Sequence, residues 1–260
     1  MLQRIGVFDS GIGGLTVLRQ LRRAFPALNM VYLGDTARVP YGSRSVETIN
    51  RYARDDVRFL LARQVEAVVI ACGTVSSNSL DVLRSEFDCP IYGVIESAAV
   101  RAVKLTKSGT VGVIGTQATV KSGAYERAIH AIDPAVRVVS QACPLFVPLV
   151  ENGIAPSDEV AEIVCSRYLE AFDGTGTDAL IMGCTHYPVY RPALEKRLPG
   201  VTMIDVGEAL SESLRQSFGE VGGNGQTEYF VSERSAAFNE IVHIMDETVD
   251  PGKIRAETIE

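Results

Sequence analysis

The chain repeats one order of short apolar segments, and this repeat restricts its possible folds more than any other feature. Residues 5–10 resemble residues 111–116, and the segments that follow in each half correspond at offsets of 106 to 112 residues. Further matching pairs are Val69-Ile70-Ala71-Cys72 with Ile181-Met182-Gly183-Cys184, and Val39-Pro40 with Val147-Pro148. Two copies are too few for a solenoid. The repeat therefore predicts two similar halves.

Eight short apolar runs, four in each half, predict β-strands. Most of them are apolar at nearly every position, which is typical of parallel strands that helices cover on both faces. The runs are residues 4–8, 30–33, 67–71, 91–94, 110–114, 136–140, 179–182 and 201–204.

Amphipathic helices are predicted between these strands. Residues 45–64 have one apolar face, and Ser45 is placed to cap the start of that helix. Another helix begins near Ser157, and its predicted apolar face consists of Val160, Ile163, Val164 and Tyr168. The alternation of strands and helices predicts an α/β layer fold with parallel sheets.

The residues after the second half are too few for a core of their own. Residues 207–218 predict a helix, residues 228–231 an edge strand, and a last helix carries Phe238, Ile241, Val242 and Met245. We expect this tail to pack on the first half. The predicted division is a first α/β domain of residues 1–97 plus 208–260 and a second of residues 98–207.

The composition excludes several classes of protein. Acidic residues outnumber basic ones by 32 to 25, so we expect no nucleic acid partner, because such a partner needs a basic surface. No apolar run approaches the roughly 20 residues of a membrane helix, and the N-terminus lacks a signal-peptide pattern, so no membrane association is expected. Five cysteines without a C-x-x-C pair predict a reducing compartment, the cytoplasm.

Two of these cysteines, Cys72 and Cys184, occupy matching places at the carboxyl ends of predicted strands. Ligands of open α/β sheets bind at that edge, and a helix N-terminus near the sulfur would favour a thiolate by lowering the thiol pKa. A single cysteine in such a place is more often a small buried apolar residue. A matched pair instead suggests two thiols that approach one ligand from opposite sides, an arrangement that suits proton transfer at a stereocentre. Cys89, Cys143 and Cys165 have no counterparts and are interpreted as structural.

The first predicted strand ends in Asp9, which precedes Ser10 and the glycine-rich turn Gly11-Ile12-Gly13-Gly14. Backbone N–H groups of such a turn can hold a carboxylate or a phosphate. The spacing matches neither nucleotide-binding glycine motif. Asp9 is thus either a cap in a tight turn or a carboxylate that takes a proton from a neighbouring thiol.

Three further residues are candidates for the site. Tyr41, with Gly42, follows a polar loop that could bind a carboxylate or simply turn the chain. Glu151 occupies the similar loop of the second half, where it is either solvated or buried after an apolar stretch. His186 lies two residues after Cys184; this spacing is weak evidence for zinc, which needs three or four ligands, and better fits an acid/base partner of the thiol.

Together these segments resemble the glutamate racemases over nearly the whole chain. The similarity rests on GVFDSGIGGL at residues 6–15, GDTARVPYG at residues 34–42 and GCTHYP at residues 183–188, with further matches at residues 112–116 and 124–125. The resemblance implies two similar α/β domains with the active site between them. It also implies racemisation of L-glutamate to D-glutamate for peptidoglycan, with no cofactor or metal, by an enzyme that commonly forms homodimers.

The resemblance also implies roles for individual residues. Cys72 and Cys184 would be the proton donors and acceptors, Asp9 would assist Cys72, and Glu151 and His186 would assist Cys184. The residues implied to hold the glutamate substrate are Asp9, Ser10, Tyr41, Gly42, Gly73, Thr74, Thr116, Thr185 and His186. One position departs from the family, because Gly73 stands where Asn usually follows the first cysteine. The contact of that Asn side chain with the amino acid would be missing, while the Gly73 N–H remains.

Two alternatives stay open at this point. One is an aspartate or broad-specificity amino-acid racemase of the same superfamily, which the glycine at position 73 keeps in view. The other is a two-lobed protein that binds an acidic amino acid without chemistry, for which the two cysteines would not be needed.

Overall fold

The computed structural model describes residues 1–259, and its named strands form two sheets in which every neighbouring pair runs parallel. The strands of the first sheet are β1 Arg4–Asp9, β2 Asn29–Gly34, β3 Ala67–Ile70, β4 Ile91–Tyr92, β9 Thr227–Val231 and β10 Ile254–Ala256. Those of the second are β5 Thr110–Gly115, β6 Arg137–Ala142, β7 Ala179–Met182 and β8 Thr202–Asp205. All eight strands predicted in the two halves are present.

The two sheets share one topology. The first has the order β10-β9-β2-β1-β3-β4, and the second has the order β6-β5-β7-β8. The second order repeats the segment β2-β1-β3-β4 of the first strand for strand. This match confirms the predicted fold class of two similar α/β halves with parallel sheets.

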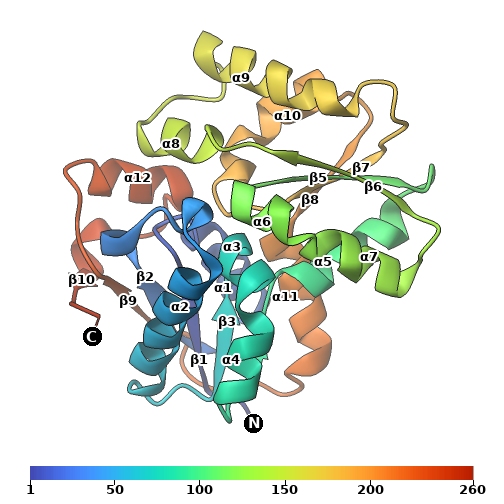
Figure 1. The fold of residues 1–260 in the computed structure, drawn as a ribbon. Helices are drawn as coiled ribbons and strands as arrows, with labels where there is room; N and C mark the ends of the chain where they lie inside the picture. The colour runs from blue at the N-terminus through green and yellow to red at the C-terminus, as the bar shows by residue number, and fades with distance from the viewer. Residues whose placement is uncertain (260) are drawn as a thin grey trace.

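The C-terminal strands extend the first sheet beyond β2, as Figure 1 shows in orange and red. The tail therefore packs on the first half, as predicted. The prediction that residues 228–231 form an edge strand is wrong, because β9 pairs with β2 on one side and with β10 on the other. The edge strand β10 has the sequence Ile-Arg-Ala, which is too short and too polar to be recognised as a strand.

Helices cover the sheets and fill the space where the two halves meet (Figure 1). None of those in residues 1–259 combines the length and the apolar character needed to cross a membrane. Short 3₁₀ helices lie at Thr36–Arg38, Tyr41–Ser43, Glu170–Phe172, Tyr187–Tyr190 and Pro251–Lys253. The α-helices are α1 Leu15–Ala24, α2 Val46–Leu61, α3 Gly73–Asn78, α4 Leu80–Glu86, α5 Ile95–Leu105, α6 Gln117–Ser122, α7 Ala124–Ile132, α8 Phe146–Glu151, α9 Glu159–Leu169, α10 Arg191–Arg197, α11 Val206–Ser217 and α12 Phe238–Met245.

The core has two parts, one on each face of the first sheet. On one face Phe8, Ile70 and Leu60 belong to a cluster closed by α2 and α4. Ser45 caps α2 as predicted, since its Oγ accepts a hydrogen bond from the Thr48 N–H. On the other face the buried side chains of α1, α5 and α11 continue into the core of the second half. The two halves are thus packed together over one continuous apolar region.

The predicted apolar face of α9 is wrong at two of its four residues. Val160 and Ile163 are 50% and 59% exposed, and the buried residues of this helix are Ala161, Cys165 and Leu169. The buried stripe follows an i, i+4, i+8 spacing. The other two predicted residues, Val164 and Tyr168, are partly buried and pack against the core beside this stripe.

Candidate active site

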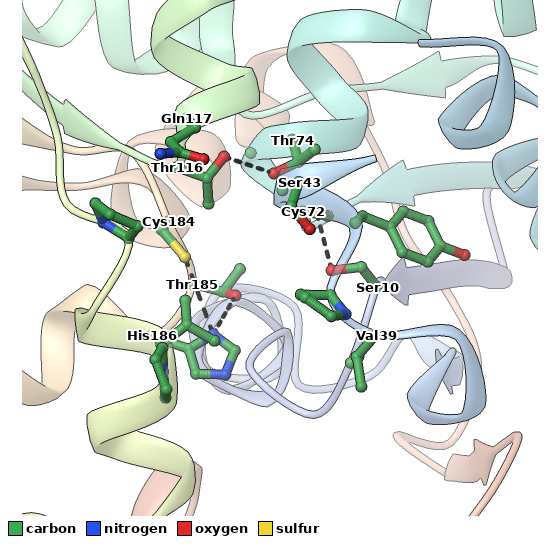
Figure 2. A pocket seen from close by; sticks show the side chains of 18 of the residues that line it. Ser10, Val39, Ser43, Cys72, Thr74, Thr116, Gln117, Cys184, Thr185 and His186 are labelled. Carbon is green, nitrogen blue, oxygen red and sulfur yellow. Dashed lines mark hydrogen bonds between the residues drawn. The ribbon is translucent and has the colours of Figure 1, made fainter. Parts of the chain in front are cut away.

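A cavity of about 380 Å³ lies where the carboxyl ends of the two sheets face each other. Both cysteines, Cys72 and Cys184, line it, and Figure 2 shows them on opposite sides of the open space. The other lining residues are Ser10, Gly11, Val39, Pro40, Tyr41, Gly42, Ser43, Gly73, Thr74, Thr116, Gln117, Pro144, Val147, Pro148, Glu151, Thr185 and His186. The repeat therefore brings its two matched thiols to one ligand-sized space.

Cys72 follows β3 and is the N-cap residue of α3. Its thiol donates a hydrogen bond to Ser10 Oγ at 3.3 Å. Burial raises the pKa of this thiol to about 12, and the negative charge of Asp9 adds to the rise. The prediction of a lowered pKa is therefore wrong for Cys72, because the cost of burying a charge exceeds the stabilisation from the helix N-terminus.

Cys184 has a different electrostatic setting. Its Sγ lies 4.0 Å from His186 Nδ1, and His186 Nε2 lies 3.3 Å from Glu151 Oε1. Burial alone would lower the pKa of His186, but its hydrogen bonds with Cys184 and Glu151 outweigh burial and raise that pKa to about 10. The imidazole therefore favours its charged form, which places a positive charge between the sulfur and the carboxylate.

Asp9 ends β1 and is almost completely buried. Burial raises the pKa of its carboxyl to about 6, although the charge of His186 and the N–H groups of Gly14 and Gly11 partly oppose this. Oδ2 accepts a hydrogen bond from the Gly11 N–H at 3.2 Å, while Oδ1 has no partner among residues 1–259. Asp9 lies behind the cavity wall rather than in it, so its position fits a partner of Cys72 better than the predicted contact with substrate.

Hydroxyl groups from the two halves meet at the cavity. Thr74 Oγ1 lies 2.9 Å from Thr116 Oγ1, a contact drawn in Figure 2. Thr116 also caps α6, where its Oγ1 accepts a hydrogen bond from the Thr119 N–H. On another side Thr16 Oγ1 donates to the backbone oxygen of Thr185 at 2.9 Å. These contacts bring the predicted residues Thr74, Thr116 and Thr185 together across the halves.

The surroundings of position 73 account for glycine in place of the usual Asn. A Cβ atom at this position would lie 2.1 Å from the backbone oxygen of Gly183, which precedes Cys184. No side chain fits there unless the backbone moves. Glycine at position 73 thus lets the two cysteine-bearing segments touch through their backbones.

The prediction for Tyr41 needs a correction. Tyr41 borders the cavity, but its hydroxyl points away from the cavity, where it donates to Asp35 Oδ2 and also lies 3.2 Å from Asp56 Oδ2. The hydroxyl is therefore not free to bind a substrate, and only the rest of the residue can do so. Its neighbour Gly42 packs against Thr116, where a Cβ would lie 2.9 Å from Thr116 Cβ.

The sequence interpretation missed part of the cavity wall. The residues missed are Val39, Pro40, Ser43, Gln117, Pro144, Val147 and Pro148. A signal was present, because Val39-Pro40 and Val147-Pro148 correspond in the repeat and both line the cavity. Within residues 1–259, no three or more His, Cys, Asp or Glu side chains are grouped so that they could hold a metal ion.

Comparisons with known proteins identify the family of the chain. Residues 5–214 match the Asp/Glu/Hydantoin racemase family model. The glutamate racemase of Aquifex aeolicus is 45% identical to the chain, with 98% of each covered, and that of Sulfurihydrogenibium is 41% identical, with 98% and 96% covered. The chain therefore belongs to the Asp/Glu/hydantoin racemase family.

Solved structures narrow the assignment. The glutamate racemase of Thermus thermophilus in complex with β-chloro-D-alanine has a TM-score of 0.87 at 41% identity, with 99% of this chain and 97% of that chain covered. The glutamate racemase of Francisella tularensis in complex with D-glutamate has a TM-score of 0.91 at 33% identity, with 99% and 98% covered. Within the family the chain groups with the glutamate racemases.

Proposed function

We propose that this enzyme interconverts L-glutamate and D-glutamate, and that Cys72 and Cys184 exchange protons with the two faces of the α-carbon. The observation that carries the proposal is the pair of matched cysteines on opposite sides of one cavity, each with its own acid/base neighbour. The D-glutamate so formed would supply peptidoglycan synthesis.

The two cysteines start in different protonation states in this mechanism. Cys72 begins as the neutral thiol, which its raised pKa favours. Cys184 begins as the thiolate beside the charged imidazole of His186. The Cys184 thiolate takes the α-proton of L-glutamate and becomes a thiol, and the carbanion takes a proton from the Cys72 thiol on the opposite face. Charge and protons balance, and the reverse sequence converts D-glutamate to L-glutamate.

The carbanion needs stabilisation from the protein. Hydroxyl groups of Ser10, Thr74 and Thr116, together with the Gly73 N–H at the start of α3, surround the space between the thiols. Donors of this kind, fixed in a cavity that excludes water, stabilise negative charge on the substrate carboxylate as it develops. We expect them to hold the α-carboxylate and so to offset part of the barrier to proton removal.

The test is incorporation of deuterium at the α-carbon. In heavy water, with a chelator present and no pyridoxal phosphate added, the enzyme should exchange the α-proton of L-glutamate for deuterium. The circular dichroism signal of the glutamate should disappear as it racemises. Cys72→Ser and Cys184→Ser should each lower the racemisation rate by at least about 10³-fold, because near neutral pH a serine hydroxyl is a far weaker acid/base group than a thiol. Cys89→Ser is the control, since Cys89 is half-exposed and lies outside the cavity. Glutamate binding without exchange would instead indicate a non-catalytic binding protein.

Substrate preference is a separate part of the proposal. The glycine at position 73 keeps aspartate as an alternative substrate, because it leaves out a side chain that would contact the amino acid. The aspartate racemase of Picrophilus torridus shares the fold, with a TM-score of 0.60, but is only 20% identical. We therefore expect a higher kcat/KM for L-glutamate than for L-aspartate, and equal or reversed values would favour the alternative.

Two features of organisation complete the proposal. We propose domains of residues 1–97 plus 208–260 and of residues 98–207, and limited proteolysis near residues 97 and 207 would test this division.

We also propose a homodimer, for which the exposed apolar side chains Val160 and Ile163 on α9 offer one available surface. Sedimentation of the purified protein would decide between monomer and dimer.

A further inference from the structure

The loop between β2 and α2 forms one wall of the cavity, although it contains only two 3₁₀ turns. Residues 39–43 of this loop all line the cavity. Such a segment has few backbone hydrogen bonds of its own and would be mobile without other attachments. The charged residues beneath it supply those attachments.

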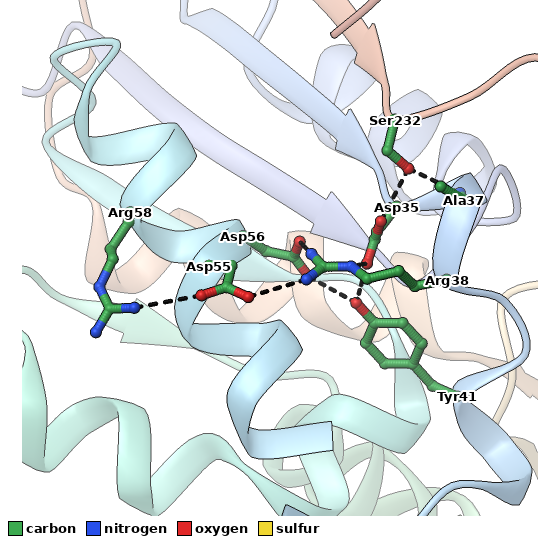
Figure 3. Close-up of polar contacts among 8 residues, drawn as sticks. All are labelled: Asp35, Ala37, Arg38, Tyr41, Asp55, Asp56, Arg58 and Ser232. Atoms are coloured by element: carbon green, nitrogen blue, oxygen red, sulfur yellow. Dashed lines mark hydrogen bonds and ion pairs between the residues drawn. The ribbon is translucent and has the colours of Figure 1, made fainter. Parts of the chain in front are cut away.

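Arg38 is the centre of these contacts, which Figure 3 draws. Its Nε donates to Asp35 Oδ2 at 2.5 Å, its Nη1 to Asp55 Oδ2 at 2.9 Å and its Nη2 to Asp56 Oδ1 at 3.0 Å. The guanidinium also lies over the ring of Tyr52, 4.4 Å from its centroid. One cation thus joins the loop to three side chains of α2, namely Asp55, Asp56 and Tyr52.

Two of these three carboxylates, Asp35 and Asp56, form ion pairs with Arg38 alone among residues 1–259. The side chains of Asp35 and Asp56 are fully buried, and Arg38 is the residue that forms ion pairs with both. The Tyr41 hydroxyl lies within hydrogen-bond distance of both, and donates to Asp35 in the shorter contact. Burial raises the pKa of Asp56, and the charge of Asp35 adds to this rise. Removal of the guanidinium would leave two buried acids beside each other with no cation to join them, so the loop would lose its charged attachment to α2.

A second attachment comes from the C-terminal part of the chain. Ser232, just after β9, donates from its Oγ to Asp35 Oδ1 at 2.8 Å and accepts a hydrogen bond from the Ala37 N–H at 2.8 Å. The start of the loop is therefore held from both sides, by α2 through Arg38 and by the C-terminal tail through Ser232.

We propose that Arg38 is a positioning residue, which with Asp35 and Asp56 fixes the loop that presents the backbone of Tyr41, Gly42 and Ser43 to the substrate. The inference rests on the proposed racemase function for its kinetic consequences. Arg38 itself does not line the cavity, so it acts through the loop and not on the reacting atoms.

The experiment compares Arg38→Met with Arg54→Met. Arg54 also forms short ion-pair hydrogen bonds, two of them to Glu86, at 2.6 and 2.7 Å. This pair joins α2 to α4 away from the cavity. Arg38→Met should raise the KM for both glutamate enantiomers and lower kcat/KM by about 10- to 100-fold, as expected when binding groups are misplaced. Arg54→Met should keep the KM of the unmodified enzyme.

A second measurement does not depend on activity. Amide hydrogen exchange in residues 36–44 should accelerate in Arg38→Met and stay unchanged in Arg54→Met, because only the first releases the loop. Arg38→Lys should recover part of the protection, since an ammonium keeps the charge but loses the planar fork that reaches three carboxylates. Should Arg38→Met fail to fold, Asp56→Asn provides the same comparison with one contact removed.

The outcomes separate the two proposals. An unmodified enzyme that racemises no amino acid overturns the proposed function, while the exchange measurement still tests the attachment of the loop. An active enzyme in which Arg38→Met leaves both KM and loop exchange unchanged overturns the positioning role. A fall in kcat alone, with unchanged KM and exchange, indicates loss of folded protein and also overturns it.

Discussion

The site depends on two ionisable groups whose pKa values are both raised in the folded protein, for different reasons. The Asp9 carboxyl has a pKa raised to about 6 by burial, and the His186 imidazole has a pKa raised to about 10, where its hydrogen bonds outweigh burial. Near neutral pH the first is therefore mostly ionised, and the second is mostly protonated. A carboxylate behind Cys72 and a cation beside Cys184 are the states that the proposed mechanism needs.

These two groups predict a bell-shaped dependence of kcat/KM on pH. Activity should fall below about pH 6, where Asp9 loses the charge with which it assists Cys72, and above about pH 10, where His186 loses the charge that stabilises the Cys184 thiolate. Because the two enantiomers have equal free energies, the profile must be the same in both directions. A flat profile between pH 5 and 11 would contradict the assignment of both groups.

Asp9 should also cost the folded protein stability. An acid whose pKa is raised on folding destabilises the folded state progressively as pH rises from about 4 to about 6, and the cost stays constant above that. A shift from 3.8 to about 6 corresponds to about 3 kcal/mol. Asp9→Asn should therefore raise the free energy of unfolding at pH 7.5 but much less at pH 4, while kcat falls. Denaturant unfolding at the two pH values measures this, and an equal effect at both would contradict the raised pKa.

At the scale of elements, buried parallel strands were the most predictable part of the molecule. A strand such as β3 or β7 is apolar at every position, so its pattern survives without knowledge of the rest of the fold. The three-residue strand β10 has no such pattern and exists because β9 offers it a free edge. The buried face of α9 was predicted only in part for a similar reason. Apolar residues lie on more than one side of this helix, and the side that is buried depends on the surface it packs against.

The sequence predicted which residues form the candidate site, but not their pKa values or the directions of their side chains. The repeat and the motifs placed Cys72 and Cys184 at the cavity, because strand ends of parallel sheets meet at one edge. The raised pKa of Cys72 depends on burial by residues distant in sequence. The direction of the Tyr41 hydroxyl depends on the buried acids Asp35 and Asp56, which only the folded chain brings together.

The contact between the start of α3 and the segment after β7 predicts a sensitive position. In Gly73→Ala the added Cβ would meet the Gly183 backbone oxygen at 2.1 Å, so the two cysteine-bearing segments must separate. We expect kcat/KM to fall by about 10- to 100-fold, because the reacting groups no longer reach both faces of one carbon. Gly252→Ala is the control, since its Cβ would meet only the side chain of Asp250. Steady-state kinetics that match the unmodified enzyme would show that the contact is not needed.

At the scale of the whole molecule, closure of the cavity depends on hydrogen bonds that cross between the halves. Thr116→Val removes the partner of Thr74 and also the cap of α6. Loss of a cap costs about 1 kcal/mol of stability, and loss of the crossing contact should in addition raise the KM for glutamate. Ser45→Ala removes a cap of the same kind from α2, away from the cavity, and should lower stability without a change in KM. Equal KM values in the two variants, measured beside their unfolding free energies, would refute a role of Thr116 in closure.

Within residues 1–259, the backbone passes from one sheet to the other only between β4 and β5 and between β8 and β9. The helices on these two passages, α5 and α11, pack against each other. Because the two passages lie side by side, the covalent links between the halves are confined to one side of the molecule. We expect the two halves to separate by rotation about these helices, which would widen the cavity on the side away from them.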